Sequence, residues 1–155
     1  MAIPNLIALL SPSGNSREFE VELAGIDEDA VSAFITEVQA LEPPIRIVAL
    51  ETIARSRWNF GLDLCRALFK DPDVDVRVAA LRASVKLGGD PDVLGRRTMR
   101  ELAATDPNYD VQQSAFDALT VFATAPVFEL VQELIKDPAT PSCIRKRAQK
   151  FLANP

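Results

Sequence analysis

A repeat of about 33 residues constrains this sequence more than any other feature. Each copy opens with a β-branched residue and has an alanine four positions later, which is the same face of a helix. A small side chain at that position lets a neighbouring helix come close. The copies begin at Ile45, Val76, Val111 and Ile144, and their alanines are Ala49, Ala80, Ala115 and Ala148.

The clearest copy is the stretch DPDVDVRVAALRASVKLGGD, from Asp71 to Asp90. Its first three residues predict a turn that starts a helix, because an aspartate side chain can accept the free N–H groups of the first helical turn and Pro72 fixes φ. Gly88 predicts the helix end, since glycine adopts the left-handed conformation without a steric penalty. A proline turn precedes all four copies, at Pro43-Pro44, Asp71-Pro72, Asp106-Pro107 and Asp137-Pro138.

A second amphipathic segment lies before each turn, at Asp29 to Leu41, Phe60 to Lys70, Val93 to Ala104 and Val127 to Lys136. We call these four segments the A segments. The segments that follow the proline turns, which begin at Ile45, Val76, Val111 and Ile144, are the B segments. One such pair buries too little apolar surface to offset its conformational entropy, whereas stacked pairs share a core. The sequence therefore predicts an all-α stack of four helix pairs over residues 28–155, within a single domain of residues 1–155 whose first 27 residues form a cap.

The cap does not follow the repeat. In Arg17 to Leu23, apolar residues alternate with Glu18, Glu20 and Glu22, which is the period of a strand. Pairing with Asn5 to Leu10 would make this segment a β-hairpin that covers the first helix pair; a short helix over Ile3 to Leu10 is the alternative.

The composition limits the chemistry. The chain has no histidine, so it lacks the commonest general base and the usual zinc ligand. It also has no Gly-rich phosphate loop and no CxxC motif, and DPDVDV lacks the glycine and the distal glutamate of a calcium loop. We therefore expect no catalytic residues, no metal and no cofactor, and nothing in the sequence indicates a small-molecule ligand.

The charge of −5 is unevenly distributed. Residues 1–42 hold eight acidic residues and only one basic residue, Arg17, whereas Arg145, Lys146, Arg147 and Lys150 make the last stretch basic. An acidic chain without a long basic stripe is a poor nucleic-acid binder.

No apolar run is long enough to span a membrane, and the N-terminus lacks the leading basic residues of a signal peptide. We expect a cytoplasmic protein with no membrane partner. Its two cysteines, Cys65 and Cys143, are then expected to be buried free thiols, although a single disulfide is the alternative.

The pattern Asp-x-x-x-x-Val-Arg-x-x-Ala-Leu, ending in Leu-Gly-Gly-Asp, resembles the HEAT-like repeat of the phycobilisome lyase type. Asp71, Val76, Arg77, Ala80, Leu81, Leu87, Gly88 and Asp90 carry the resemblance, which extends over roughly residues 28–153. The other copies depart from the pattern, with Gln112 in place of the arginine, Gln149 in place of the leucine and no aspartate at Pro43-Pro44. The resemblance implies a short right-handed α-solenoid of four helix pairs.

Two rows of side chains recur at equivalent B-segment positions. Arg46, Arg77, Gln112 and Arg145 form the first row, and Glu51, Arg82, Asp117 and Lys150 form the second. If the B segments line the concave face, as in most such solenoids, a row of mixed sign suits a protein surface of complementary charge. A solvated helical face is the alternative interpretation for both rows.

Several residues have a structural interpretation beside a functional one. Asp71 with Arg77, and Asp106 with Gln112, are expected to tie a turn to a helix. Trp58, the only tryptophan, is either an interface anchor or a cap on the core between the first two pairs. Arg96, Arg97 and Arg100 are expected to be a solvated cluster, and Cys65 an inert buried thiol.

These observations predict a non-enzymatic scaffold or adaptor that binds a partner protein through the B-segment face. The predicted contacts are Arg46, Trp58, Arg77, Arg82, Gln112 and Asp117. The resemblance leaves two alternatives: a bilin lyase or lyase subunit acting on phycobiliproteins, and a HEAT-like protein that processes nucleic acid, which the acidic composition disfavours.

Overall fold

The chain folds into helices that pack as antiparallel pairs within two compact units. A computed structural model describes residues 7–10, 16–88 and 92–154. The described residues contain helices and no strands, so the prediction of an all-α protein is confirmed. The first unit comprises residues 1–87 and the second residues 88–155. The single domain predicted for residues 1–155, and the right-handed solenoid, stay predictions.

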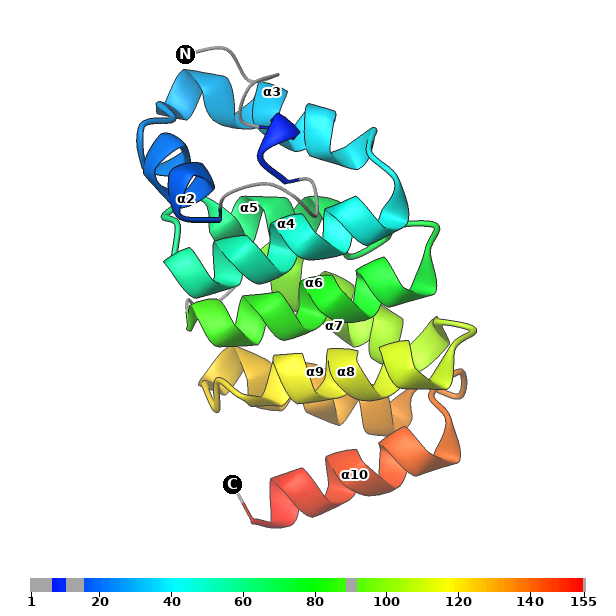
Figure 1. The fold of residues 1–155 in the computed structure, drawn as a ribbon. Helices are drawn as coiled ribbons and strands as arrows, with labels where there is room; N and C mark the ends of the chain where they lie inside the picture. Colours follow the sequence, from blue (N-terminus) through cyan, green and yellow to red (C-terminus); the bar gives the residue numbers. More distant parts are fainter. Residues whose placement is uncertain (1–6, 11–15, 89–91, 155) are drawn as a thin grey trace. The chain divides into compact units, whose positions relative to one another are not determined.

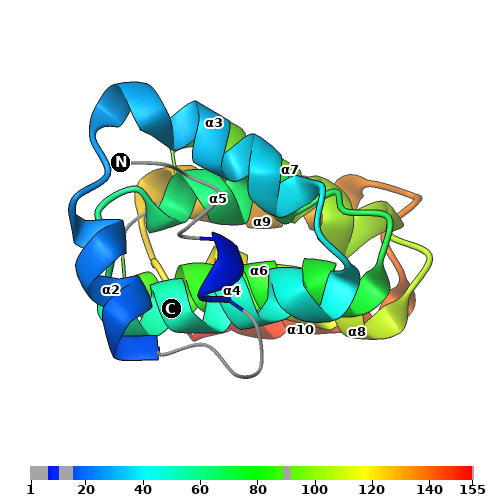
Figure 2. The same cartoon turned by 45° about the horizontal axis from the view of Figure 1, so that its top comes forward.

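The first unit contains two helix pairs that form two layers. The A helices α3 (Glu28–Gln39) and α5 (Gly61–Leu68) lie side by side in one layer, and the B helices α4 (Pro43–Ser56) and α6 (Val74–Leu87) lie in the other (Figures 1 and 2). A further helix, α2 (Ser16–Ala24), packs against α4.

The second unit repeats this arrangement. Its A helices are α7 (Val93–Thr105) and α9 (Ala125–Lys136), and its B helices are α8 (Tyr109–Thr120) and α10 (Ser142–Ala153). Helix α7 packs against α8 and α9, and α10 packs against α8 and α9. All four A segments predicted from the sequence are helices whose ends differ from the predicted ones by at most a few residues.

The repeated alanines hold the B helices together. Ala49, Ala80, Ala115 and Ala148 are each 0% exposed, as predicted. The β-branched residue that opens each copy is also buried in three of them, at Val76, Val111 and Ile144, whereas Ile45 is half-buried. A side chain of one carbon leaves room for the neighbouring helix at these positions, which explains why the repeat places alanine there.

Asparagine or aspartate starts the helices after two of the proline turns. The Asp73 carboxylate accepts hydrogen bonds from the N–H groups of Asp75 (2.9 Å) and Val76 (3.1 Å), and Asn108 does the same for Asp110 and Val111. Before each of these caps, the first aspartate of the turn, Asp71 or Asp106, accepts a hydrogen bond from the N–H two residues later. These bonds satisfy donors that a helix start leaves unpaired.

A buried arginine closes the first proline turn. Arg46 donates from Nη1 to the carbonyl of Gln39 (3.3 Å) and to that of Leu41, and from Nη2 to the Asp71 carboxylate (2.9 Å). The Arg46 and Asp71 side chains are 9% and 5% exposed. The pair therefore connects the end of α3, the start of α4 and the turn before α6.

The equivalent side chains close the other turns. Arg77 donates to the carbonyls of Asp71 (2.8 Å) and Pro72 (3.2 Å), and Gln112 donates to the carbonyl of Asp106 (2.7 Å). Arg145 donates to the carbonyls of Asp137 (3.2 Å) and Thr140 (3.1 Å). The turn-to-helix tie expected of Asp71 with Arg77, and of Asp106 with Gln112, is present, and it runs through backbone carbonyls.

The predicted β-hairpin is wrong. Residues Arg17 to Leu23 lie in helix α2, where Phe19 and Leu23 are each 1% exposed and Val21 is 67% exposed. The buried residues are thus four apart, on one helical face, and Glu is a better helix former than strand former. Residues 7–10 make a helical turn in which the Leu10 N–H donates to the Ile7 carbonyl; Asn5, Leu6 and residues 11–15 lie outside the described residues.

Replacing Arg46 by methionine tests the role of the turn closure. The substitution keeps most of the side-chain volume but leaves the buried Asp71 carboxylate without its cation, so we expect the free energy of unfolding to fall by about 3 kcal/mol. Urea denaturation of Arg46→Met and of the double variant Arg46→Met/Asp71→Asn measures this free energy. The double variant should recover part of the loss, because Asp71→Asn removes the buried charge.

Arg82→Met is the matched control for this test, because Arg82 is an exposed arginine of a B helix. Its free energy of unfolding should stay within about 0.5 kcal/mol of the wild-type value. Equal losses in Arg46→Met and Arg82→Met would show that the buried pair does not stabilise the turn.

Candidate functional site

The first predicted row of partner contacts faces the turns. Arg46 and Arg77 are each 8% exposed, and their guanidinium groups are occupied by turn carbonyls. Gln112 is half-buried and bonded to its own turn. The structure gives all three a structural role, so we remove Arg46, Arg77 and Gln112 from the surface that we consider for partner binding.

The second row faces solvent. Glu51, Arg82, Asp117 and Lys150 are all exposed. In each unit two of them lie beside a groove between the two B helices, which run side by side (Figure 1). The predicted contacts Arg82 and Asp117 therefore lie on the B-helix surface of different units.

The groove between α4 and α6, which we call the N-terminal groove, has a volume of about 280 Å³. The half-buried side chains of Ile47 and Val78 form part of its lining. Charged residues of both signs complete the lining: Glu51, Asp75, Arg82 and Lys86. Within the part of the chain that the structure describes, no ion pair involves any of these four side chains.

The groove between α8 and α10, the C-terminal groove, has a volume of about 380 Å³. Phe116 and Thr120 line it from α8, and four residues line it from α10: Arg147, Lys150, Phe151 and Asn154. It contains two aromatic rings and two basic side chains. None of the described residues that line it is acidic.

The two grooves occupy equivalent positions of the repeat. When the B segments are aligned on their buried alanines, Ala54 corresponds to Thr120 and Arg82 corresponds to Lys150. The main substitutions between the grooves replace Ala79 by Arg147 and Ala83 by Phe151. The repeat thus builds the same kind of groove twice, with different side chains.

Asp117 belongs to a bonded cluster. Its carboxylate pairs with Nη2 of Arg147, whose Nη1 donates to the side-chain carbonyl of Gln113 (2.6 Å). The same guanidinium lies 4.9 Å from the centre of the Phe116 ring. Asp117 therefore helps to fix Arg147 at the wall of the C-terminal groove.

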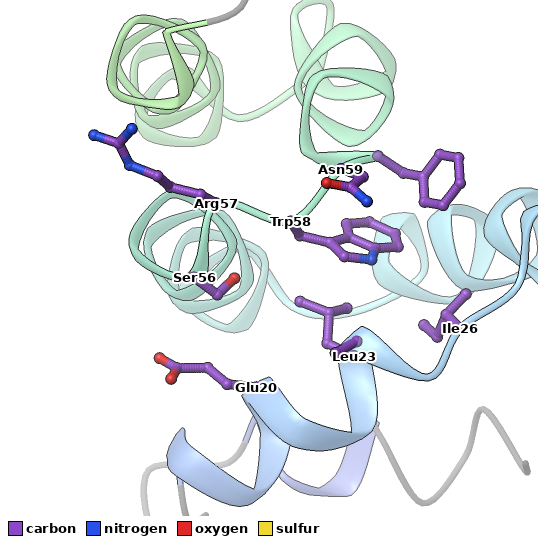
Figure 3. A pocket seen from close by; sticks show the side chains of 9 residues that line it. Glu20, Leu23, Ile26, Ser56, Arg57, Trp58 and Asn59 are labelled. Atoms are coloured by element: carbon purple, nitrogen blue, oxygen red, sulfur yellow. The ribbon is translucent and has the colours of Figure 1, made fainter.

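Trp58 is part of the core and also borders a pocket. It is 8% exposed, and its ring makes edge contacts with Phe34 and Phe60 at centroid distances of 5.4 and 5.5 Å. Its indole lies over Leu23 and Ile26 in a pocket of about 240 Å³ (Figure 3). Burial favours the core-cap interpretation for Trp58, and its position beside α2 separates it from the N-terminal groove, whose lining does not include it.

The arginines of α7 are not a single solvated cluster. Arg97 is exposed, but Arg100 pairs with Asp137 (2.8 Å) and Glu133 (3.5 Å). The Ala139 N–H and the Arg100 guanidinium both bond to the Asp137 carboxylate, and they hold the pKa of that carboxyl below its usual value. Arg100 therefore links α7 to the end of α9.

Other site classes receive little support from the described residues. Among them, no three His, Cys, Asp or Glu side chains are grouped so that they could hold a metal ion. None of the described helices combines the length and the apolar character needed to cross a bilayer. Both cysteines are free thiols; Cys65 is buried as predicted, whereas Cys143 is only half-buried.

Comparison with known proteins adds no identification. No protein-family model matches this sequence, and searches of curated proteins and of solved structures give no match either. The geometry of the grooves is therefore the basis for assigning a function.

The sequence reasoning missed three residues of the C-terminal groove, namely Phe116, Arg147 and Phe151. A signal for two of them was present. Arg147 and Phe151 replace the alanines found at the same repeat positions in the clearest copy, Ala79 and Ala83. Exchange of alanine for a large side chain at a repeat position indicates that the packing beside that position, and the surface above it, differ between copies.

The two thiols should react very differently. Burial raises the pKa of Cys65 to about 12, so its thiol stays protonated and shielded, while Cys143 is half-buried. We expect iodoacetamide at pH 8.5 to label Cys143 and to leave Cys65 unmodified until the protein is unfolded in urea. Peptide mass spectrometry measures both; equal labelling of the folded protein would contradict the packing around α5.

Proposed function

We propose that this protein is a non-catalytic interaction module that binds a partner protein through the solvent face of its B helices. One observation carries the proposal: the N-terminal groove presents four charged side chains of both signs that make no ion pairs among the described residues. The HEAT-like architecture, with B helices on the concave side, belongs to the same proposal.

The charged side chains of the N-terminal groove are available to form ion pairs with a partner protein. Glu51 of α4 and Arg82 of α6 are exposed on the two sides of one groove. An exposed ion pair between them would add little to stability, so the fold loses little by leaving them open. Charges of both signs select a complementary surface and reject one of uniform charge.

The lining of the groove supplies apolar contact as well. Ile47 and Val78 are half-buried, and Ala54, Ala79 and Ala83 keep the groove open between the two helices. An apolar side chain of a partner could remove Ile47 and Val78 from water while its neighbours meet the charged rim, which is the usual organisation of a protein interface.

The mixed charge favours a protein over a polyanion, and the bilin-lyase and nucleic-acid alternatives stay predictions from the sequence. We also propose a cytoplasmic location, which the two free thiols support because thiols persist in reducing compartments.

A charge reversal at Arg82 tests the proposal. Tagged wild-type protein and Arg82→Glu are used to capture partners from a lysate of the source cells, and captured proteins are quantified by mass spectrometry. We expect recovery of the specific partner to fall roughly tenfold or more with Arg82→Glu, because the new glutamate meets an acidic group of the partner.

Arg97→Glu is the matched control, since Arg97 is also an exposed arginine but lies on the A helix α7. It makes the same change in net charge and should leave recovery unchanged. Equal recovery with wild type and Arg82→Glu, or an equal loss with Arg97→Glu, would exclude the N-terminal groove as the binding surface.

A further inference from the structure

The C-terminal groove differs from its repeat equivalent in a way that defines a ligand. We propose that it binds an acidic segment of a partner protein that carries one large apolar side chain. This inference rests on the proposed function and specifies the chemistry of the partner at the second groove.

The Phe151 ring provides the aromatic surface of the groove. It is half-buried and stacked on Phe128, with ring centroids 5.4 Å apart, whereas Phe116 is only 3% exposed and is part of the core. A ring held in this way loses little conformational entropy when a ligand covers it. It forms a firm surface for an apolar side chain.

Arg147 forms a fixed wall. Its guanidinium lies over the Phe116 ring and is bonded to Gln113 and Asp117 of α8. Its charge is therefore partly balanced by Asp117, and its orientation is set by three contacts. This residue shapes the groove and is not the main source of its charge.

The open positive charge of the groove comes from Lys150, which lines it. Lys146 is exposed four residues earlier on α10 but does not line the groove, and neither lysine has an ion-pair partner within the described residues. Like charges at this spacing destabilise a helix by a few tenths of a kcal/mol. Lys150 also stands at the end of α10, where a cation interacts favourably with the helix dipole, but Lys146 does not.

The contrast with the N-terminal groove sets the sign of the ligand. There, the acidic side chains of Glu51 and Asp75 line the groove and make no ion pair with any residue that the structure describes. In the C-terminal groove the residue equivalent to Glu51 is Asp117, which is occupied by Arg147. The charge of the C-terminal groove that has no ion-pair partner among the described residues is therefore positive, and carboxylates are the groups that complement it.

Selection of peptides from a random displayed library on the whole protein tests the inference. Peptides that bind should combine at least two acidic residues with an aromatic or large aliphatic residue. Their affinity should fall about tenfold in Lys150→Glu, because a cation that met a carboxylate becomes a like charge. Lys150 is exposed, so this substitution should not unfold the protein.

Two further variants place the binding site. Phe151→Leu shortens the apolar surface and should weaken the same peptides, with circular dichroism used to check folding. Arg82→Glu changes the other groove by the same two charge units as Lys150→Glu and should leave these peptides unaffected.

Four results would overturn the inference. The first three are selected peptides without acidic residues, no peptide that binds, and peptides whose affinity depends on Arg82 but not on Lys150. The last result would leave the proposed function intact, since binding would then occur at the N-terminal groove. A dimer of the chain that dissociates in Lys150→Glu would identify a second copy as the occupant, and would also overturn it.

Discussion

Hydrogen bonds from one B-helix side chain to the carbonyls of the preceding turn hold each helix pair in shape. Arg46, Arg77, Gln112 and Arg145 all make such bonds, although their charges and partners differ. A helix leaves its last carbonyls without partners, and a proline turn cannot supply enough N–H groups to satisfy them. The angle between an A helix and its B helix depends on this closure.

The sequence predicted the packing better than the surface. Alanine at one repeat position has a single physical explanation, close helix packing, and Ala49 and Ala115 are fully buried. Alternation in Arg17 to Leu23 had two explanations, because residues that alternate also fall four apart, and burial of Phe19 and Leu23 selected the helix. The arginine row was misread because a long side chain can fold back onto its own turn, which the residue type alone does not reveal.

The grooves show how a repeat can separate stability from recognition. Turn closure and the buried alanines use the same positions in every copy, whereas the groove positions change freely between Ala79 and Arg147 or between Ala83 and Phe151. The alanines keep the N-terminal groove open, and the larger side chains line the C-terminal groove with an aromatic and a basic surface. Two sites of unlike chemistry can arise in this way without a change of fold.

The burial of the only tryptophan gives the protein an internal optical reporter. Trp58 lies in the first unit, among Phe34, Phe60 and α2, so its fluorescence senses water only when that unit opens. Far-ultraviolet circular dichroism sums the helices of both units. Denaturation curves from the two signals coincide if the chain unfolds in one cooperative transition. They separate if each unit unfolds at its own denaturant concentration.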